Sequence, residues 1–194
     1  MCIRDSNSIY SIYKDYEGGI WIGTMFGGVN YLPNRILTFA KYVPGSDPYS
    51  LNTKRIRGLA EDNNGCIWIG TEDNGVNVLD PRTGKVHQIY DNVPGRLITL
   101  SVKHYENHIY VGLFKQGMND ISIPGEHLKY VSDKDLGIEE GSVYSFLKDS
   151  KGRTWIGPGW GLYVSQPKER KFHRVEEVGY NWVFDIMEAR DGTI

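Results

Sequence analysis

The chain has 194 residues, of which 40% are hydrophobic, so it can bury a sizeable core and lacks the composition of a disordered protein. Its 22 basic and 24 acidic residues give a formal net charge of −2, which argues against nucleic acid as a partner. No apolar run approaches the roughly 20 residues that cross a membrane as a helix.

The first six residues, "MCIRDS", are polar and lack the apolar region of a signal peptide. We expect residues 1–6 to be a non-native or disordered leader. Cys66 lies in an apolar run and reads as a small buried hydrophobe, and nothing supports a disulfide to Cys2. His104 and His108 are four apart in a strand-like segment, where that spacing does not align them, so we expect no metal site and no cofactor.

One phrase returns along the chain. It reads "GIWIGT", "CIWIGT" and "RTWIGP" in three copies and "HIYVGL" in a degenerate copy, in which Tyr110 replaces Trp. The copies align on four glycines: Gly23, Gly70, Gly112 and Gly157. These glycines are 47, 42 and 45 residues apart, and a period of 40–50 residues indicates a repeat architecture.

Each copy predicts four short strands joined by three tight turns. In the second copy an alternating strand, "RIRGLAED", leads through Asp-x-x-Gly into the Trp-Ile-Gly strand. An Asn-Gly turn then leads to "VNVLD", and the turn "DPRTGK" leads to "VHQIY". Asp and Gly suit such turns because Asp bonds the turn backbone and Gly accepts a positive φ. The unbroken apolar second strand predicts burial on both of its faces.

Four antiparallel strands per unit, with the units stacked face to face, make a β-propeller blade. The sequence therefore predicts an all-β fold, a β-propeller of four-stranded antiparallel blades, as an incomplete arc of four blades plus the start of a fifth. A β-sandwich competes, but it would not need the same phrase in every repeat. The repeats are expected at about 7–50, 51–94, 95–140, 141–178 and, truncated, 179–194. Trp21, Trp68 and Trp155 are expected in the core.

The phrase Asp-x-x-Gly-x-Ile-Trp-Ile-Gly-Thr, followed by a glycine turn and Val-Asn-x-Leu, resembles the two-component regulator propeller repeat. The segment "SDPYSLNTKRIRGLAED" before the second copy resembles it too. The resemblance covers residues 7–194 and is weak in the third copy, which lacks the Asp-x-x-Gly turn.

The resemblance implies the periplasmic sensor part of a membrane-anchored hybrid two-component regulator of the Bacteroidetes type. Such a sensor has two seven-bladed propellers, followed by an immunoglobulin-like domain, a membrane span and a histidine kinase that this chain does not contain. It implies an oligosaccharide ligand, and as further partners the remaining blades and a second copy in a homodimer. It also implies that this segment is not an enzyme.

If the first strand of each blade is innermost, the second turns and the linkers between blades share one face. We expect the ligand on that face, at residues that depart from the repeat, because aromatic platforms mixed with amides and charges suit a sugar. Glu140 is a further linker residue there. The expected ligand-binding residues are Phe26, Asn52, Arg55, Asp73, Asn74, Arg96, Lys115, Trp160, Tyr180 and Trp182.

Two other functions stay open at this stage. Propellers also host carbohydrate-active enzymes such as lyases and glycosidases, since fold alone does not decide function. That function needs convergent titratable groups, whereas Asp73, Glu140 and the histidines look dispersed along the sequence. The other alternative is a scaffold that binds protein partners through the surface of the disc.

Overall fold

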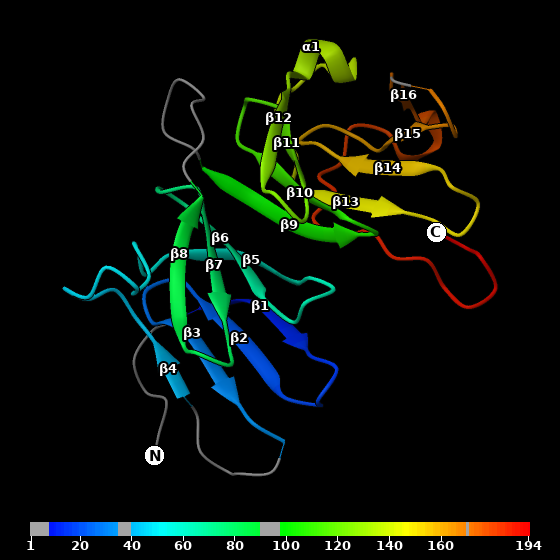
Figure 1. Ribbon diagram of the computed structural model, residues 1–194. Helices are drawn as coiled ribbons and strands as arrows, with labels where there is room; N and C mark the ends of the chain where they lie inside the picture. Colours follow the sequence, from blue (N-terminus) through cyan, green and yellow to red (C-terminus); the bar gives the residue numbers. More distant parts are fainter. Residues whose placement is uncertain (1–7, 35–39, 90–97, 170) are drawn as a thin grey trace. The chain divides into compact units, whose positions relative to one another are not determined.

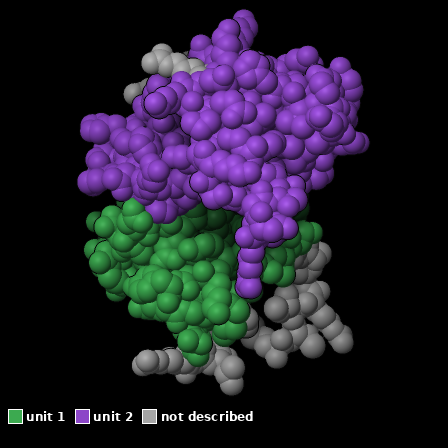
Figure 2. Space-filling view, turned by 90° about the vertical axis from the view of Figure 1, so that its right-hand side faces the viewer, with its two compact units in different colours: residues 1–96 green, residues 97–194 purple. Residues whose placement is uncertain are grey.

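The computed structural model describes residues 8–34, 40–89, 98–169 and 171–194 (Figure 1). The chain forms two compact units, residues 1–96 and 97–194, which are coloured separately in Figure 2. The expected leader, Cys2 and Arg96 lie outside the described residues. The repeat limits drawn from the sequence stay predictions.

The first unit contains two antiparallel sheets whose strands pair in chain order. One sheet consists of β1 (Ile9–Lys14), β2 (Ile20–Thr24), β3 (Gly28–Leu32) and β4 (Ala40–Tyr42). The other consists of β5 (Ile56–Glu61), β6 (Ile67–Thr71), β7 (Val76–Asp80) and β8 (Lys85–Ile89). The Trp-Ile-Gly phrase forms β2 and β6, and β6 is buried along its whole length, as the sequence predicts.

The second unit also contains two such sheets. One consists of β9 (Thr99–Tyr105), β10 (His108–Leu113), β11 (Met118–Ser122) and β12 (His127–Val131). The other consists of β13 (Ser145–Lys148), β14 (Thr154–Gly157), β15 (Tyr163–Ser165) and β16 (His173–Arg174). The predicted all-β fold of four-stranded antiparallel blades is therefore confirmed.

Helix is confined to two short pieces of the described chain. They are the single-turn helix α1 (Asp133–Leu136), with a capping box from Ser132 and Asp135, and the 3₁₀ turn η1 (Glu176–Val178). Among the residues that the structure describes, no helix has the length and apolarity to cross a bilayer.

The aspartate of the Asp-x-x-Gly turn binds the indole of the following tryptophan. Trp21 Nε1 donates to Asp15 Oδ2 at 2.7 Å, and the equivalent bonds from Trp68 to Asp62 and from Trp155 to Asp149 are both 2.9 Å. The other carboxylate oxygen accepts turn N–H groups, such as that of Cys66 at 3.0 Å. The sequence identified these aspartates as turn formers, and the structure adds that they satisfy the buried indoles.

The third blade replaces this pair by aromatic stacking. Its hairpin turns at Glu106, which has φ 57°, and Tyr110 takes the tryptophan position. The Tyr110 ring stacks on Phe146 at a centroid distance of 4.5 Å, and burial raises the pKa of Tyr110 to about 12. The Tyr110 hydroxyl therefore stays protonated at neutral pH.

The glycine of the Trp-Ile-Gly phrase lies where the chain enters the next repeat, directly before its first strand or the segment equivalent to it. A Cβ on Gly157 would lie 2.5 Å from Val183 O, and one on Gly112 would collide with Val143 O. Beside these glycines, Ser145 Oγ donates to Val183 O at 2.9 Å, and Ser101 Oγ donates to Val143 O at 3.1 Å. Glycine is thus required for neighbouring blades to pack.

The first strand carries a β-bulge at the same place in three blades. Its pairing with the second strand skips Tyr10 in β1, Arg57 in β5 and Leu100 in β9. In each case the next residue is small and pairs with the glycine of the phrase: Ser11, Gly58 and Ser101. A bulge re-aims the side chain that it carries, so this position leaves the regular alternation of the strand.

We expect Gly157→Ala to destabilise the chain by about 1–3 kcal/mol, because the new methyl group meets the backbone of residue 183 and cannot be accommodated by a side-chain rotation. Chemical denaturation measures this loss. Gly45→Ala is the matched control, since its Cβ would meet nothing closer than Ser50 Oγ at 3.6 Å. Equal stability of the two variants would contradict the close approach of the blades.

We expect the Asp149 pair to make stability depend on pH. Burial alone would raise the pKa of Asp149, but hydrogen bonds from Trp155 and Arg153 lower it below its ordinary value. Because the native pKa lies below the unfolded value of about 3.9, the stabilisation is present above that pH and is lost as pH falls through the native pKa.

Asp149→Asn should therefore cost about 1–3 kcal/mol at neutral pH and progressively less in acid. Denaturation midpoints of both proteins between neutral pH and about pH 3 measure the difference. Asp47→Asn serves as control, because Asp47 lies on an exposed loop, where its Oδ1 accepts from Tyr49 N at 2.8 Å. A difference that stays constant with pH would refute this assignment.

Candidate functional site

The second turn of each blade and the linker that enters the next blade lie at the same end of the sheets. In the first unit, Asn52 of the linker donates from Nδ2 to Asn74 O of the second turn at 2.9 Å. In the second unit, Lys115 N of one second turn donates to Ser142 Oγ of the next linker at 3.1 Å. We call this end of each unit the second-turn face. It is defined by residues 25–27, 50–57 and 72–74 in the first unit and by residues 114–116, 138–144, 159–160 and 180–184 in the second.

Phe26 and Arg55 come together on the second-turn face of the first unit. The Arg55 guanidinium carbon lies 5.5 Å from the centre of the Phe26 ring, and 46% of Phe26 is exposed. A cation over an aromatic face is a favourable contact at the surface. This pair presents an accessible apolar surface beside a positive charge, which suits the ring and hydroxyl edge of a sugar.

The asparagines that the sequence selected hold the linker to the turn. Asn74 Nδ2 returns a bond to Asn52 O at 3.4 Å, and Asn77 Nδ2 donates to Asn52 Oδ1 at 2.9 Å. Both the nitrogen and the oxygen of the Asn52 side-chain amide are therefore engaged in hydrogen bonds within the protein. Asp73 differs, because its Oδ1 is buried and has no hydrogen-bond partner among the described residues.

Arg57 and Glu72 form an ion pair on the same face, which the sequence analysis did not select. Arg57 Nη2 lies 3.3 Å from Glu72 Oε1, and the two side chains are 28% and 22% exposed. The Arg57 guanidinium carbon also lies 4.7 Å from the centre of the Tyr10 ring. The only sequence signal for Tyr10 and Arg57 is their place directly before the small residue that faces the phrase glycine.

On the second unit, Lys115 and Glu140 are tied to the loops. Lys115 has φ 57°, and its Nζ lies 5.2 Å from the centre of the Phe114 ring. Glu140 Oε1 accepts from Ser142 Oγ at 2.7 Å, and its Oε2 accepts from Gly159 N at 3.1 Å. Glu140 is thus a structural acceptor that joins the linker to the second turn.

Exposed aromatic rings gather on the same face of this unit. Trp160 is 49% exposed and Trp182 is 52% exposed. Trp182 lies 5.2 Å from Tyr144 and 5.6 Å from Phe184, measured between ring centres. These distances are typical of interacting aromatic pairs, so three rings form one cluster.

Tyr180 has a different environment from these rings. The Arg174 guanidinium carbon lies 3.5 Å from the centre of the Tyr180 ring. This contact holds the linker that follows η1 against β16. Ligand binding by Tyr180, as by the other selected residues, stays a prediction.

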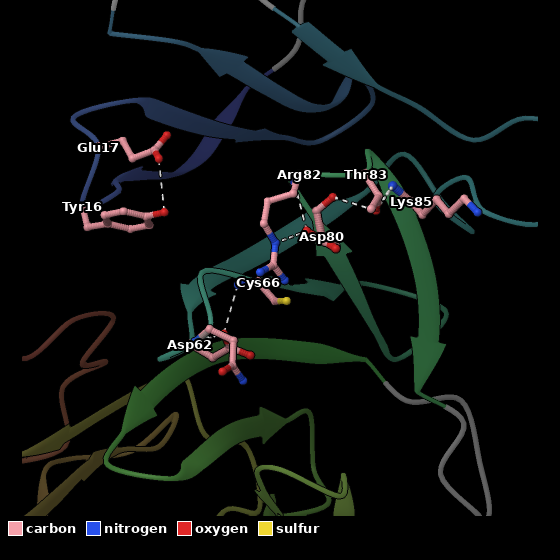
Figure 3. A network of polar contacts seen from close by, with 9 residues as sticks. Tyr16, Glu17, Asp62, Cys66, Asp80, Arg82, Thr83 and Lys85 are labelled. Carbon is pink, nitrogen blue, oxygen red and sulfur yellow. Dashed lines mark hydrogen bonds and ion pairs between the residues drawn. The ribbon is translucent and has the colours of Figure 1, made fainter.

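The opposite end of the first unit holds polar contacts within turns, as Figure 3 shows. Arg82 Nε donates to Asp80 Oδ1 at 3.1 Å, and the Tyr16 hydroxyl donates to Glu17 at 3.2 Å. At this end Tyr13 donates its hydroxyl to Glu61 Oε2 at 2.8 Å, which joins β1 to β5. Burial raises the pKa of both Tyr13 and Glu61, so this pair is a structural link between two blades.

A metal centre has no support in the described part of the chain, where no three His, Cys, Asp or Glu residues come together to hold an ion. The second-turn face instead offers aromatic surface with amides, guanidinium groups and carboxylates. Such a surface binds by stacking and hydrogen bonding.

Comparison with known proteins identifies the repeat. Residues 4–26 and 50–73 match the two-component regulator propeller family. No curated protein matches the sequence. The matched segments carry the first Trp-Ile-Gly phrase and the linker, first strand and second strand of the second copy, so the predicted resemblance is confirmed there.

Solved structures confirm the propeller fold. The extracellular domain of a hybrid two-component system from B. thetaiotaomicron superposes with TM-score 0.79 and 23% identity, over 95% of this chain and 25% of that chain. PorZ, a surface component of the type-IX secretion system of Porphyromonas gingivalis, gives TM-score 0.67 and 16% identity over 94% of this chain and 30% of its own. A virginiamycin B lyase from Staphylococcus aureus gives TM-score 0.69 and 11% identity, over 90% of this chain and 58% of that chain. The chain thus spans a quarter of the length of the two-component relative.

We expect Asn52→Ala to destabilise the chain by about 1–3 kcal/mol, because it removes the bonds that fasten the linker to Asn74 and Asn77. Trp160→Ala should change stability by less than about 0.5 kcal/mol, since half of that side chain is already in water. Urea denaturation of the two variants measures the contrast. Equal effects would show that Asn52 does not fasten the linker.

Proposed function

Because the chain carries two-component regulator propeller repeats, we propose that it is part of the ligand-sensing propeller of a membrane-anchored hybrid two-component regulator. In this proposal it lies outside the cytoplasm, in the periplasm, and binds an oligosaccharide. Further blades complete the ring, and binding biases a homodimer that signals to a histidine kinase elsewhere in the protein. The chain itself catalyses no reaction in this proposal.

The observation that carries the proposal is the composition of the second-turn face in both units. Phe26 stands beside Arg55 in the first unit, and Trp160 and Trp182 are half exposed in the second. Sugars offer apolar C–H faces to aromatic rings and hydroxyl edges to polar groups, so such a surface matches their chemistry. In the first, second and fourth blades the tryptophan of the repeat is buried instead, which leaves recognition to residues outside the repeat.

We expect the chain to bind at least one member of a panel of defined oligosaccharides in titration calorimetry. Trp182→Ala should weaken that binding about tenfold, because stacking on one aromatic face contributes on the order of 1 kcal/mol. Tyr130→Ala is the matched control, since Tyr130 is an exposed aromatic residue on β12, outside the second-turn face. If the chain binds no saccharide, the proposed ligand class is wrong. If the Trp182 variant binds with unchanged affinity, the aromatic cluster is not part of the binding site.

A further inference from the structure

The bulged position of the first strand is constant in geometry and variable in residue. Tyr10, Arg57 and Leu100 occupy it in the first three blades. In the fourth blade Tyr144 takes the same place, because Tyr144 N bonds Gly157 O at 2.9 Å while Ser145 pairs with Gly157. A bulge points its side chain out of the regular pleat, so this residue can change without altering how the blades pack.

In the first unit two bulged residues from neighbouring blades touch each other. Arg57 lies under the Tyr10 ring at 4.7 Å and pairs with Glu72 at 3.3 Å. The Tyr10 hydroxyl donates to Met25 Sδ at 3.3 Å, and a thioether sulfur is a weak acceptor. Tyr10 is 38% exposed, so it forms a weakly held cover over the ion pair.

Beneath this cover, hydrogen-bonding capacity is left over. Arg57 Nε, Glu72 Oε2 and Asp73 Oδ1 are shielded from water and have no hydrogen-bond partner among the described residues. Buried polar groups are normally paired, and leaving them unpaired is costly. Arg57, on the first strand, offers one donor, and Glu72 and Asp73, on the second turn, offer two acceptors. A group with several hydroxyls matches this set, because each hydroxyl both donates and accepts.

The proposed cluster carries more negative than positive charge. Arg57 supplies one positive charge, and Glu72 and Asp73 supply two negative charges. An acidic sugar brought here would meet two carboxylates against one guanidinium group, so it would gain no net attraction. A neutral ring satisfies the unpaired atoms without adding a charge.

We propose that Tyr10, Arg57, Glu72 and Asp73 form a subsite for one neutral sugar ring, which enters between Tyr10 and Arg57. The Tyr10 ring then stacks on the sugar, whose hydroxyls donate to Glu72 Oε2 and Asp73 Oδ1 and accept from Arg57 Nε. This subsite rests on the proposed function, because it names which residues hold the oligosaccharide and its charge class.

The second unit supports the same choice of position independently. Val183 O accepts a hydrogen bond from Ser145, and Val143 O accepts the equivalent bond from Ser101. Val183 and Val143 are therefore equivalent, and so are the residues that follow them, Phe184 and Tyr144. Phe184 and Tyr144 thus occupy equivalent positions in successive blades, and their ring centres lie 5.7 Å apart. The bulged residue of one repeat thus meets the equivalent residue of the next repeat through an aromatic ring in both units.

The test is titration calorimetry of the 194-residue chain with neutral gluco-, xylo- and manno-oligosaccharides and with an oligogalacturonate as acidic probe. Tyr10→Ala, Arg57→Met and Glu72→Gln should each weaken binding of the neutral probe about tenfold or more. Tyr16→Ala and Arg82→Met, which change the same residue types at the opposite end of the unit, are the matched controls and should bind like the original chain.

Each outcome decides between the alternatives. If a neutral saccharide binds and the three variants bind it equally well, the subsite is wrong while the proposed function stands. Tighter binding of the oligogalacturonate overturns the neutral class. If no probe binds, both proposals fall. Far-UV circular dichroism confirms folding. Tyr10→Ala keeps the test valid if Arg57→Met does not fold, because Tyr10 is 38% exposed and its hydroxyl bonds only a thioether.

Discussion

The close approach between successive blades at the phrase glycine is the constraint on which the rest of the structure depends. Gly157 faces the carbonyl of Val183, and Gly112 faces the carbonyl of Val143, with no room for a Cβ. The serine hydroxyls beside them bond the same carbonyls. This contact fixes how far each first strand slides past its neighbour, and strand pairing carries that register outward through the sheet. A side chain at the glycine would displace a whole blade.

The buried tryptophan next to this glycine creates a second requirement. An indole N–H removed from water needs an acceptor, and the aspartate six residues earlier supplies it while also closing the turn. Loss of one partner alone would leave an unpaired buried group. The third blade lacks both residues, since Tyr110 stands in the tryptophan position and its hairpin turns through Glu106 without the aspartate. The two residues therefore act as one unit.

Much of the fold follows from the sequence, whereas the site follows only in part. Period, strand order and turns are local patterns, and these predict the four-stranded blades. The ligand residues were chosen because they depart from the repeat, but linkers have backbone groups of their own to satisfy, and Asn52 and Glu140 serve that purpose. Arg57 and Tyr144 escaped notice because a bulge is invisible in a strand whose residue alternation looks regular.

A repeat that must present different ligand surfaces on one framework needs positions whose side chains do not carry the fold. The phrase residues cannot vary in this way, because Trp68 and Ile69 are buried and the glycines admit no Cβ. The bulged position can, and it holds Tyr, Arg, Leu and Tyr in four blades with the same backbone pairing. It lies directly before the residue that pairs with the phrase glycine, so strand pairing fixes its backbone. Its side chain leaves the regular alternation and is not needed for packing. Such a position combines a preorganised backbone with free choice of side chain, which is what selective binding requires.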